Sequence, residues 1–349
     1  MVWEDGEVLT LTSYPIRQIE MKIAIVGCGA VGSYYGAMLS RAGRDVHFLL
    51  RSDYEMVRRK GVKIQSPAGD FVARPKCAAK PEQIGLCDLV LIALKTTANQ
   101  EFPRLLPPLV GSGTAIVTLQ NGLGNEEELA KLFPVEQILG GLCFVCLNRL
   151  APGVIHHLDH GMIVLGEYRR YPEPRTHEIA AMFRHAGVPC KVSDNLARAH
   201  WEKLVWNIPF NGLGVAGLKC VKGLKVEDHG RTGTLQCLTT DQLLDNAHYE
   251  SHVRELMFEV ISIANKLGHD LSSALADKQI ERTRTMGAYK PSTLVDYERA
   301  LPLELSSLFE EPLRQAREVG LSTPRLEALC SALRQLDPTR QMSEHGVVE

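Results

Sequence analysis

The chain has 349 residues, of which 45% are hydrophobic and 23% are charged, and its formal net charge is -2. This near-neutral balance gives no electrostatic basis for binding nucleic acid or an anionic membrane surface, and no apolar run is long enough to span a bilayer. We therefore expect a globular protein with no nucleic-acid or membrane partner, long enough to form two domains.

Residues 1–20 carry four acidic side chains and no apolar segment of the signal-peptide type. We expect them to form an extension without fixed structure, and we expect the protein to be cytoplasmic. The nine cysteines follow no framework spacing, which indicates reduced thiols. Two patterns resemble metal motifs, the C-x-x-C of Cys143 and Cys146 and the histidines of segment 156–160. The cysteines lie in an apolar, strand-like run, and adjacent histidines on a strand face opposite ways, so we expect no metal site.

The first predicted elements surround a glycine motif. An apolar strand at 22–26 leads into Gly27-Cys28-Gly29-Ala30-Val31-Gly32, and a helix-like segment follows at 33–41. The first glycine permits a tight turn, the second lets backbone approach a phosphate, and the third lets the helix pack on the strand. The helix N-terminus then offers free N–H groups to the anion. We interpret the six motif residues as a dinucleotide site rather than as a glycine turn without a ligand.

The residues after the second strand, 45–50, bear on the choice of cofactor. NAD-binding proteins usually place an acid there, which accepts a hydrogen bond from the ribose 2′-hydroxyl and would repel a 2′-phosphate. This strand ends in Arg51 and Ser52, and both suit a phosphate. Asp53 argues the other way if the strand is longer. The sequence therefore favours NADPH.

The rest of the first half alternates strands with helices. Segments 62–66 and 71–74 are predicted to form a hairpin. Further strands are predicted at 88–94, 114–119, 138–147, 153–158, 162–166 and 188–192. Helical periodicity replaces these signals from about residue 195, with helices predicted at 255–267, 305–319 and 325–336. The expected fold class is α/β, with a Rossmann-type, doubly wound N-terminal domain at 21–194, an all-α C-terminal domain at 195–339, and a tail at 340–349. A cleft between the two domains is the expected substrate site.

A polar stripe begins the helical half. Lys203, Asn207 and Asn211 are spaced four residues apart, which places them on one helical face. Asparagine is a poor helix former, so two amides beside a lysine favour ligand binding over a solvated face. Pro209 within this pattern predicts a kink or a local break.

With this stripe, the chain resembles the ketopantoate reductase family over residues 21–335. The resemblance depends on residues that are weak signals alone and specific together. They are the glycine motif, Lys95 after the strand at 88–94, Gln120-Asn121-Gly122, the Lys203/Asn207/Asn211 stripe, Pro291-Ser292-Thr293-Leu294-Val295-Asp296, and Glu304.

The resemblance implies an NADPH-dependent reductase of 2-dehydropantoate in pantothenate biosynthesis. It implies that Lys203 is the general acid, and that Glu304 lies beside this lysine and the nicotinamide ribose. It implies further contacts by position. Asn207, Asn211 and Ser292 would bind substrate, Asn121 would lie near both substrate and the nicotinamide ribose, and Lys95 and Cys146 would contact the cofactor.

Two departures from the family pattern fall near the substrate side. The stretch 299–304 lacks the Gly-Arg that the family often carries and places Leu303 where the family usually has threonine, and segment 219–237 is longer than usual. Reduction of another branched 2-keto acid is therefore the alternative function, and a non-catalytic NADPH sensor is a remote one. The helical second domain is of a kind that often pairs, so a homodimer is possible.

Overall fold

The computed structural model describes residues 21–217 and 237–338. The predicted N-terminal extension, the predicted tail and the long segment at 219–236 lie outside these residues. Within the described part, no helix is both long and apolar enough to cross a membrane.

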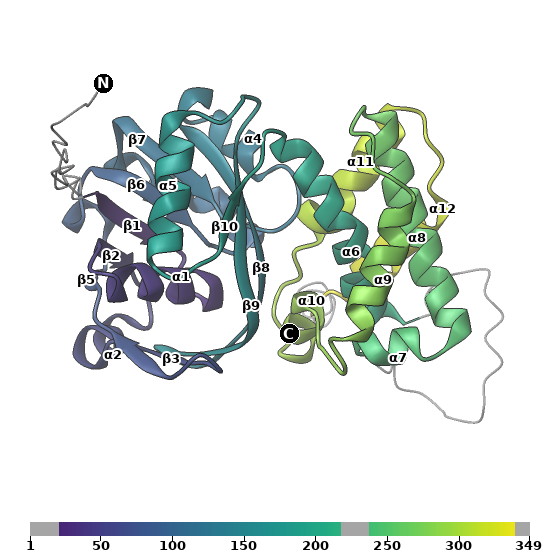
Figure 1. Ribbon diagram of the computed structural model, residues 1–349, viewed down its shortest axis with the longest axis horizontal. Coiled ribbons are helices and arrows are strands. Elements are labelled where there is room, and N and C mark those ends of the chain that lie inside the picture. The colour runs from purple at the N-terminus through teal and green to yellow at the C-terminus, as the bar shows by residue number, and fades with distance from the viewer. Residues whose placement is uncertain (1–20, 218–236, 339–349) are drawn as a thin grey trace, which may run out of the picture.

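The N-terminal domain is built on one ten-stranded mixed sheet (Figure 1). The strands are β1 (Lys22–Val26), β2 (Asp45–Leu49), β3 (Val62–Gln65), β4 (Phe71–Ala73), β5 (Lys76–Ala78), β6 (Cys87–Ile92), β7 (Val110–Thr118), β8 (Ile138–Ala151), β9 (Val154–Glu167) and β10 (Cys190–Val192). The spatial order is β4-β3-β9-β8-β7-β6-β1-β2-β5, with β10 beside β9. The run from β5 to β8 is parallel and has the 3-2-1-4-5-6 order of dinucleotide-binding folds.

This order explains why the glycine motif lies where it does. From β1 the chain continues to β2 on one side, whereas β6 lies on the other side, so the carboxyl end of β1 is the switch point of the sheet. Ligands of such sheets bind in the crevice at that point. The first helix, α1 (Ala30–Arg41), begins within the motif and starts three residues earlier than predicted.

Both faces of the parallel strands are buried, which is why their sequences are almost continuously apolar. In β1, Ile23 and Ile25 enter a core under α1 and α5 (Pro174–His185), which lie on the same face of the sheet (Figure 1). Ala24 and Val26 enter a second core on the opposite face, which includes Phe102 of α3 (Phe102–Leu105). The shorter helices of this domain are α2 (Tyr54–Lys60) and α4 (Asn125–Ala130).

Two strand predictions are wrong. Segments 153–158 and 162–166 form one continuous strand, β9, which pairs antiparallel with β8 across a bulge at His160 and Gly161. Both bulge residues have positive φ. In the sequence this interruption resembles the end of one strand and the start of another. The short edge strand β5 was missed because it has three residues and begins with a lysine. The predicted hairpin of β3 and β4 is confirmed, and β9 joins it to the main sheet.

The C-terminal region of the described chain is helical, as predicted. Its helices are α6 (Leu196–Ala216), α7 (Thr240–Leu244), α8 (Ala247–Lys266), α9 (Ala274–Arg284), α10 (Ser292–Glu298), α11 (Glu311–Glu318) and α12 (Pro324–Leu336). The long helix α6 packs against α8, α9, α10 and α12, and its residues after 203 are mostly buried. It runs through Pro209 without the predicted break. The predicted helix at 305–319 is confirmed, and its first part, Ser306–Glu310, is a π-helical turn that leads directly into α11.

Candidate active site

The glycine motif forms a tight loop between β1 and α1. Gly27 has φ +101°, and a Cβ there would lie 2.3 Å from the backbone nitrogen of Leu94. A Cβ on Gly32 would lie 2.2 Å from the carbonyl oxygen of Gly27. These two glycines are therefore required by the protein's own packing.

Gly29 differs from its two neighbours in the motif, because no atom lies within 4 Å of the position where its Cβ would be. It is the N-cap residue of α1, and no side chain caps the helix there. The open space over Gly29 and the uncapped N–H groups of α1 fit the pyrophosphate of a dinucleotide.

A cavity of about 990 Å³ extends from this loop to the helices of the C-terminal region. Almost every residue that the sequence analysis singled out lines it, from both parts of the chain. From the N-terminal domain come Gly27, Cys28, Gly29, Ala30, Val31, Arg51, Lys95, Asn121 and Cys146, and from the helical region come Lys203, Asn207, Asn211, Ser292 and Glu304. Gly32 is the exception, since it packs under the loop.

Lys203 of α6 reaches across the cavity to the N-terminal domain. Its Nζ donates a hydrogen bond of 2.7 Å to Oδ1 of Asn121, and it lies 5.5 Å from the centre of the Phe144 ring. Asn121 follows β7, and its turn is fixed because Leu123 N donates to the carbonyl oxygen of Ser307 at 2.9 Å. Burial lowers the pKa of Lys203, although Cys143 and Glu304 act in the opposite direction. A lysine with a lowered pKa beside a cavity is suited to donate a proton.

Glu304 lies in a buried ion-pair cluster rather than on the surface. Its side chain is 5% exposed, and its Oε1 accepts a 2.8 Å hydrogen bond from Thr96 N. Its Oε2 lies 3.2 Å from Nζ of Lys95, which is also 2.6 Å from Oδ2 of Asp296. Burial alone would lower the pKa of Lys95, but the two carboxylates raise it. Lys95 is therefore bound to Glu304, which the resemblance places beside Lys203 as a second catalytic residue, and this contact was not predicted from the sequence.

The two asparagines of the stripe are held differently. Oδ1 of Asn211 accepts hydrogen bonds from Thr293 N at 3.0 Å and from Oγ of Ser292 at 3.3 Å, so it joins α6 to the start of α10. Asn207 lines the cavity, and its amide forms no hydrogen bond with another described residue. The atoms of this amide are not among the buried unpaired ones, so they are open to the cavity, and Asn207 is well placed to bind a ligand.

This difference predicts a difference in stability. We expect Asn211→Ala to lower the free energy of unfolding by about 1–3 kcal/mol, because it leaves Thr293 N–H without an acceptor. Asn207→Ala is the matched control, since it breaks no hydrogen bond within the described chain. Urea unfolding of the two variants measures the difference. Equal losses would contradict this role of Asn211.

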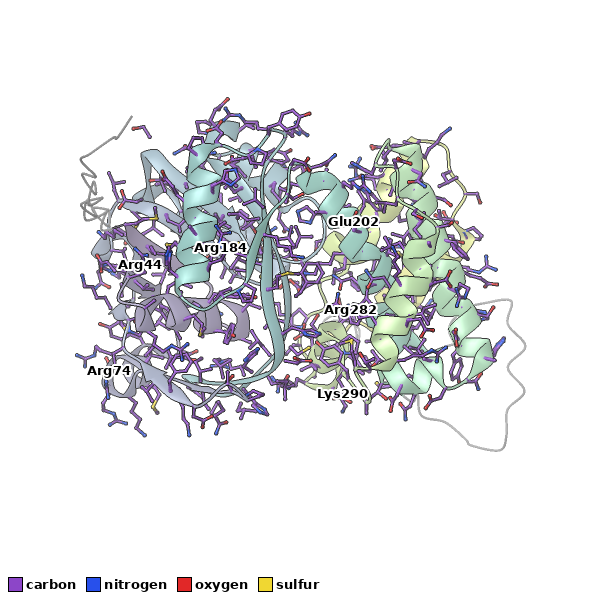
Figure 2. All side chains as sticks on the ribbon, viewed as in Figure 1. Arg44, Arg74, Arg184, Glu202, Arg282 and Lys290 are labelled. Carbon is purple, nitrogen blue, oxygen red and sulfur yellow. The ribbon has the colours of Figure 1, made fainter. Side chains whose placement is uncertain are left out.

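Two arginines of the cavity wall were not singled out by the sequence. Arg149 of β8 pairs with Asp53, and Arg282 of α9 lies on the helical side (Figure 2). Burial raises the pKa of the Cys146 thiol, and Tyr289 and Arg282 act in the opposite direction. Since Cys146 belongs to β8, Arg282 lies close enough to the sheet to influence it across the cavity. No local pattern marks either arginine.

The cysteines and histidines of the two metal-like patterns are accounted for by packing. Cys143 and Cys146 are buried free thiols of β8, and the eight described cysteines form no disulfide. His157 is held by Oγ of Ser66 at 2.9 Å and by the carbonyl oxygen of His160. Within the described ranges, no three side chains of the metal-binding types gather closely enough to hold an ion.

The fold and the site define a dinucleotide-dependent oxidoreductase with a lysine facing the cofactor side of the cavity. Two sequence models match the chain, "Ketopantoate reductase PanE/ApbA" over residues 23–170 and "Ketopantoate reductase PanE/ApbA C terminal" over residues 229–337. The 2-dehydropantoate 2-reductase of Nostoc sp. is 39% identical over 325 residues, covering 91% of this chain and 96% of the relative. The chain therefore belongs to the ketopantoate reductase family.

Solved structures agree with this assignment. The 2-dehydropantoate 2-reductase of Geobacter metallireducens has a TM-score of 0.83 and 46% identity, covering 90% of this chain and 99% of that one. A D-mandelate dehydrogenase solved with NADH and anilino(oxo)acetate has a TM-score of 0.78 and 19% identity, covering 92% and 100%. At that identity the second likeness shows only the fold. The fold thus occurs in an NADH-bound protein, so it does not by itself decide between the two cofactors.

Proposed function

We propose that this enzyme reduces 2-dehydropantoate to pantoate with NADPH, a step of pantothenate biosynthesis. The observation that carries the proposal is the position of Lys203, which is held by Asn121 at the boundary between the cofactor loop and the helical region. The relatives named 2-dehydropantoate 2-reductase supply the substrate. Arg51, which lines the cavity directly after β2, supports NADPH.

The residues that line the cavity have different roles in the proposed reaction. Bound NADPH supplies the hydride that the keto carbon accepts. Lys203 donates its proton to the developing alkoxide oxygen, and the partnerless amide of Asn207 binds polar groups of the substrate. Ser292 and Asn211, already joined by a hydrogen bond, line the wall beside Asn207. Glu304 keeps Lys95 and the backbone at Thr96 in place, which fixes the wall opposite α6.

The direct test is to mix the purified protein with NADPH and 2-dehydropantoate and to follow nicotinamide absorbance, with NADH in parallel. We expect rapid oxidation of NADPH and slow oxidation of NADH. Oxidation of neither cofactor, although NADPH binds tightly, would contradict the substrate assignment.

A different branched 2-keto acid is the second candidate. Leu303, which stands where the family usually has threonine, is 3% exposed, and the neighbouring Ala300 has φ +53°, a conformation that favours glycine. Both residues are close to Glu304 in sequence. A panel of 2-keto acids compared by kcat/KM distinguishes the two candidates. NADPH binding without turnover on any of them would favour the remote alternative, a sensor.

The lowered pKa of Lys203 predicts the pH dependence of the reduction. A general acid must be protonated, so activity is expected at pH values below the pKa of Lys203 and lost as the pH rises through it. Because burial lowers this pKa, the loss should begin below the value of an ordinary lysine, about 10.4. The measurement is kcat against pH at saturating substrates. A profile that stays level beyond pH 10 would contradict this role.

The domain boundary, the cellular location and the oligomeric state of the enzyme are proposed as follows. We propose that the cofactor-binding domain ends at residue 194 and that the substrate domain begins at residue 195, in the short turn between β10 and α6. We also propose that the enzyme is cytoplasmic, with a 2-keto acid as its small-molecule partner, and that it forms a homodimer. Size-exclusion chromatography with light scattering tests the last point.

A further inference from the structure

A buried acid and a half-buried arginine form an ion pair at the cofactor end of the cavity. Asp53 follows β2, lines the cavity and is 7% exposed. Both of its carboxylate oxygens lie 2.7 Å from Nη2 of Arg149, and Oγ of Ser52 donates to Oδ1 at 3.0 Å. Arg149 comes from β8, 96 residues further along the chain, and its side chain is 38% exposed.

The pair lies next to the glycine loop. The pKa of the Cys28 thiol is raised mainly by burial, and then by the charges of Cys77 and Asp53. The carboxylate of Asp53 is thus close enough to the loop to influence it electrostatically. In dinucleotide-binding sheets, an acid after the second strand accepts from the ribose 2′-hydroxyl and disfavours a 2′-phosphate. Asp53 is the acid in that region of this chain.

The charges around Asp53 change what this acid can do. Arg149 is bonded to both carboxylate oxygens, so the pair is neutral as a unit. Arg51 is exposed, lines the same cavity and has no ion-pair partner among the described residues. With Arg149 present, these three side chains carry a net charge of one positive unit. Without it their net charge is zero, and an unpaired carboxylate faces the cavity.

We propose that Arg149 sets the cofactor preference by neutralising Asp53, so that this acid neither repels a 2′-phosphate nor binds the ribose 2′-hydroxyl. The inference rests on the proposed preference for NADPH and adds the residue that permits it. Arg51 then provides the uncompensated positive charge. Arg149 acts through Asp53 and is a positioning residue rather than a catalytic one.

The test measures cofactor binding rather than turnover. Dissociation constants for NADPH and NADH are obtained by fluorescence titration of wild type, Arg149→Met, Asp53→Asn and the double variant. We expect Arg149→Met to weaken NADPH binding at least about tenfold and to leave NADH binding unchanged or tighter, because the exposed carboxylate acts only against the phosphate. In the double variant, NADPH affinity should return to within about threefold of wild type.

The double variant separates the proposal from its alternatives. If Arg149 bound the phosphate directly, NADPH binding would stay weak after Asp53 is neutralised, which would overturn the proposal. Equal weakening of NADPH and NADH in Arg149→Met would also overturn it, because it would indicate a structural role. If Arg149→Met does not fold, Asp53→Asn and the double variant still decide: the double variant keeps the net charge of wild type and should bind NADPH within about threefold of it, whereas Asp53→Asn gains one positive charge and should bind NADPH at least as tightly as wild type. A wild type that prefers NADH would contradict the proposed cofactor itself, independently of these variants.

Discussion

Replacing Lys203 by alanine is expected to lower kcat by a factor of about 10²–10⁴ and to leave the Kd for NADPH nearly unchanged. Lys203 lies on α6, and the tip of its side chain meets the N-terminal domain at Asn121 and over the ring of Phe144. Its removal takes away the proton donor but leaves the glycine loop intact. Steady-state kinetics and a separate NADPH titration measure the two quantities.

Two further variants keep this prediction falsifiable. Lys203→Met keeps most of the length of the side chain but has no proton donor, and we expect the same loss of kcat. Burial lowers the pKa of Lys203 in the folded protein, so the charged form is disfavoured on folding, and at pH 7 the methionine variant should be at least as stable as wild type. Lys191→Ala, on an exposed position of β10 outside the cavity, is the matched control. An unchanged kcat in Lys203→Ala would exclude the proposed role.

The second large effect is expected from the glycine loop, where one alanine substitution should weaken cofactor binding and another should lower stability. Gly29→Ala should fold normally, because φ at Gly29 is -74° and nothing lies within 4 Å of the added methyl. The methyl fills the space over the loop, so the variant should bind NADPH at least about tenfold more weakly. Gly27→Ala should lose stability by at least about 1–3 kcal/mol from its positive φ alone, and its Cβ would also meet Leu94 N.

Urea unfolding and NADPH titration of both variants distinguish these effects. Gly29→Ala should stay within about 0.5 kcal/mol of wild type in unfolding free energy. If it bound NADPH as tightly as wild type, the space over the loop would not be the phosphate site. A fully stable Gly27→Ala would show that the loop can relax around the added methyl.

Local signals predicted the cofactor side of the fold well. The strand, glycines and helix at 22–41 are contiguous, so each residue choice supports the next. The stripe of Lys203, Asn207 and Asn211 was visible because helical spacing is local. The continuity of β9 was missed because it depends on pairing with β8 across the bulge at Gly161.

The site was less predictable where distant residues meet. The contact between Lys95 and Glu304 joins residues 209 positions apart, and no periodicity in the sequence connects them. The resemblance implied that Lys95 contacts the cofactor and that Glu304 lies beside Lys203, and the structure in addition pairs Lys95 with Glu304. In the sequence alone, the acid Asp53 favours NAD, and in the structure Arg149 forms an ion pair with it. In both cases the meaning of a charge depends on a partner that only the fold supplies.

The separation of the hydrophobic cores has a consequence for how such enzymes diversify. The sheet carries its own two cores, and α6 and the helices after it form another, so the cofactor loop and the Asn207–Asn211 wall are supported by independent packing. Substitutions in one of these cores need not disturb the packing of the others. Selection can therefore change the acid that is recognised while the nucleotide site is inherited unaltered. Chimeras of two such enzymes, joined between β10 and α6, would exchange one specificity and keep the other.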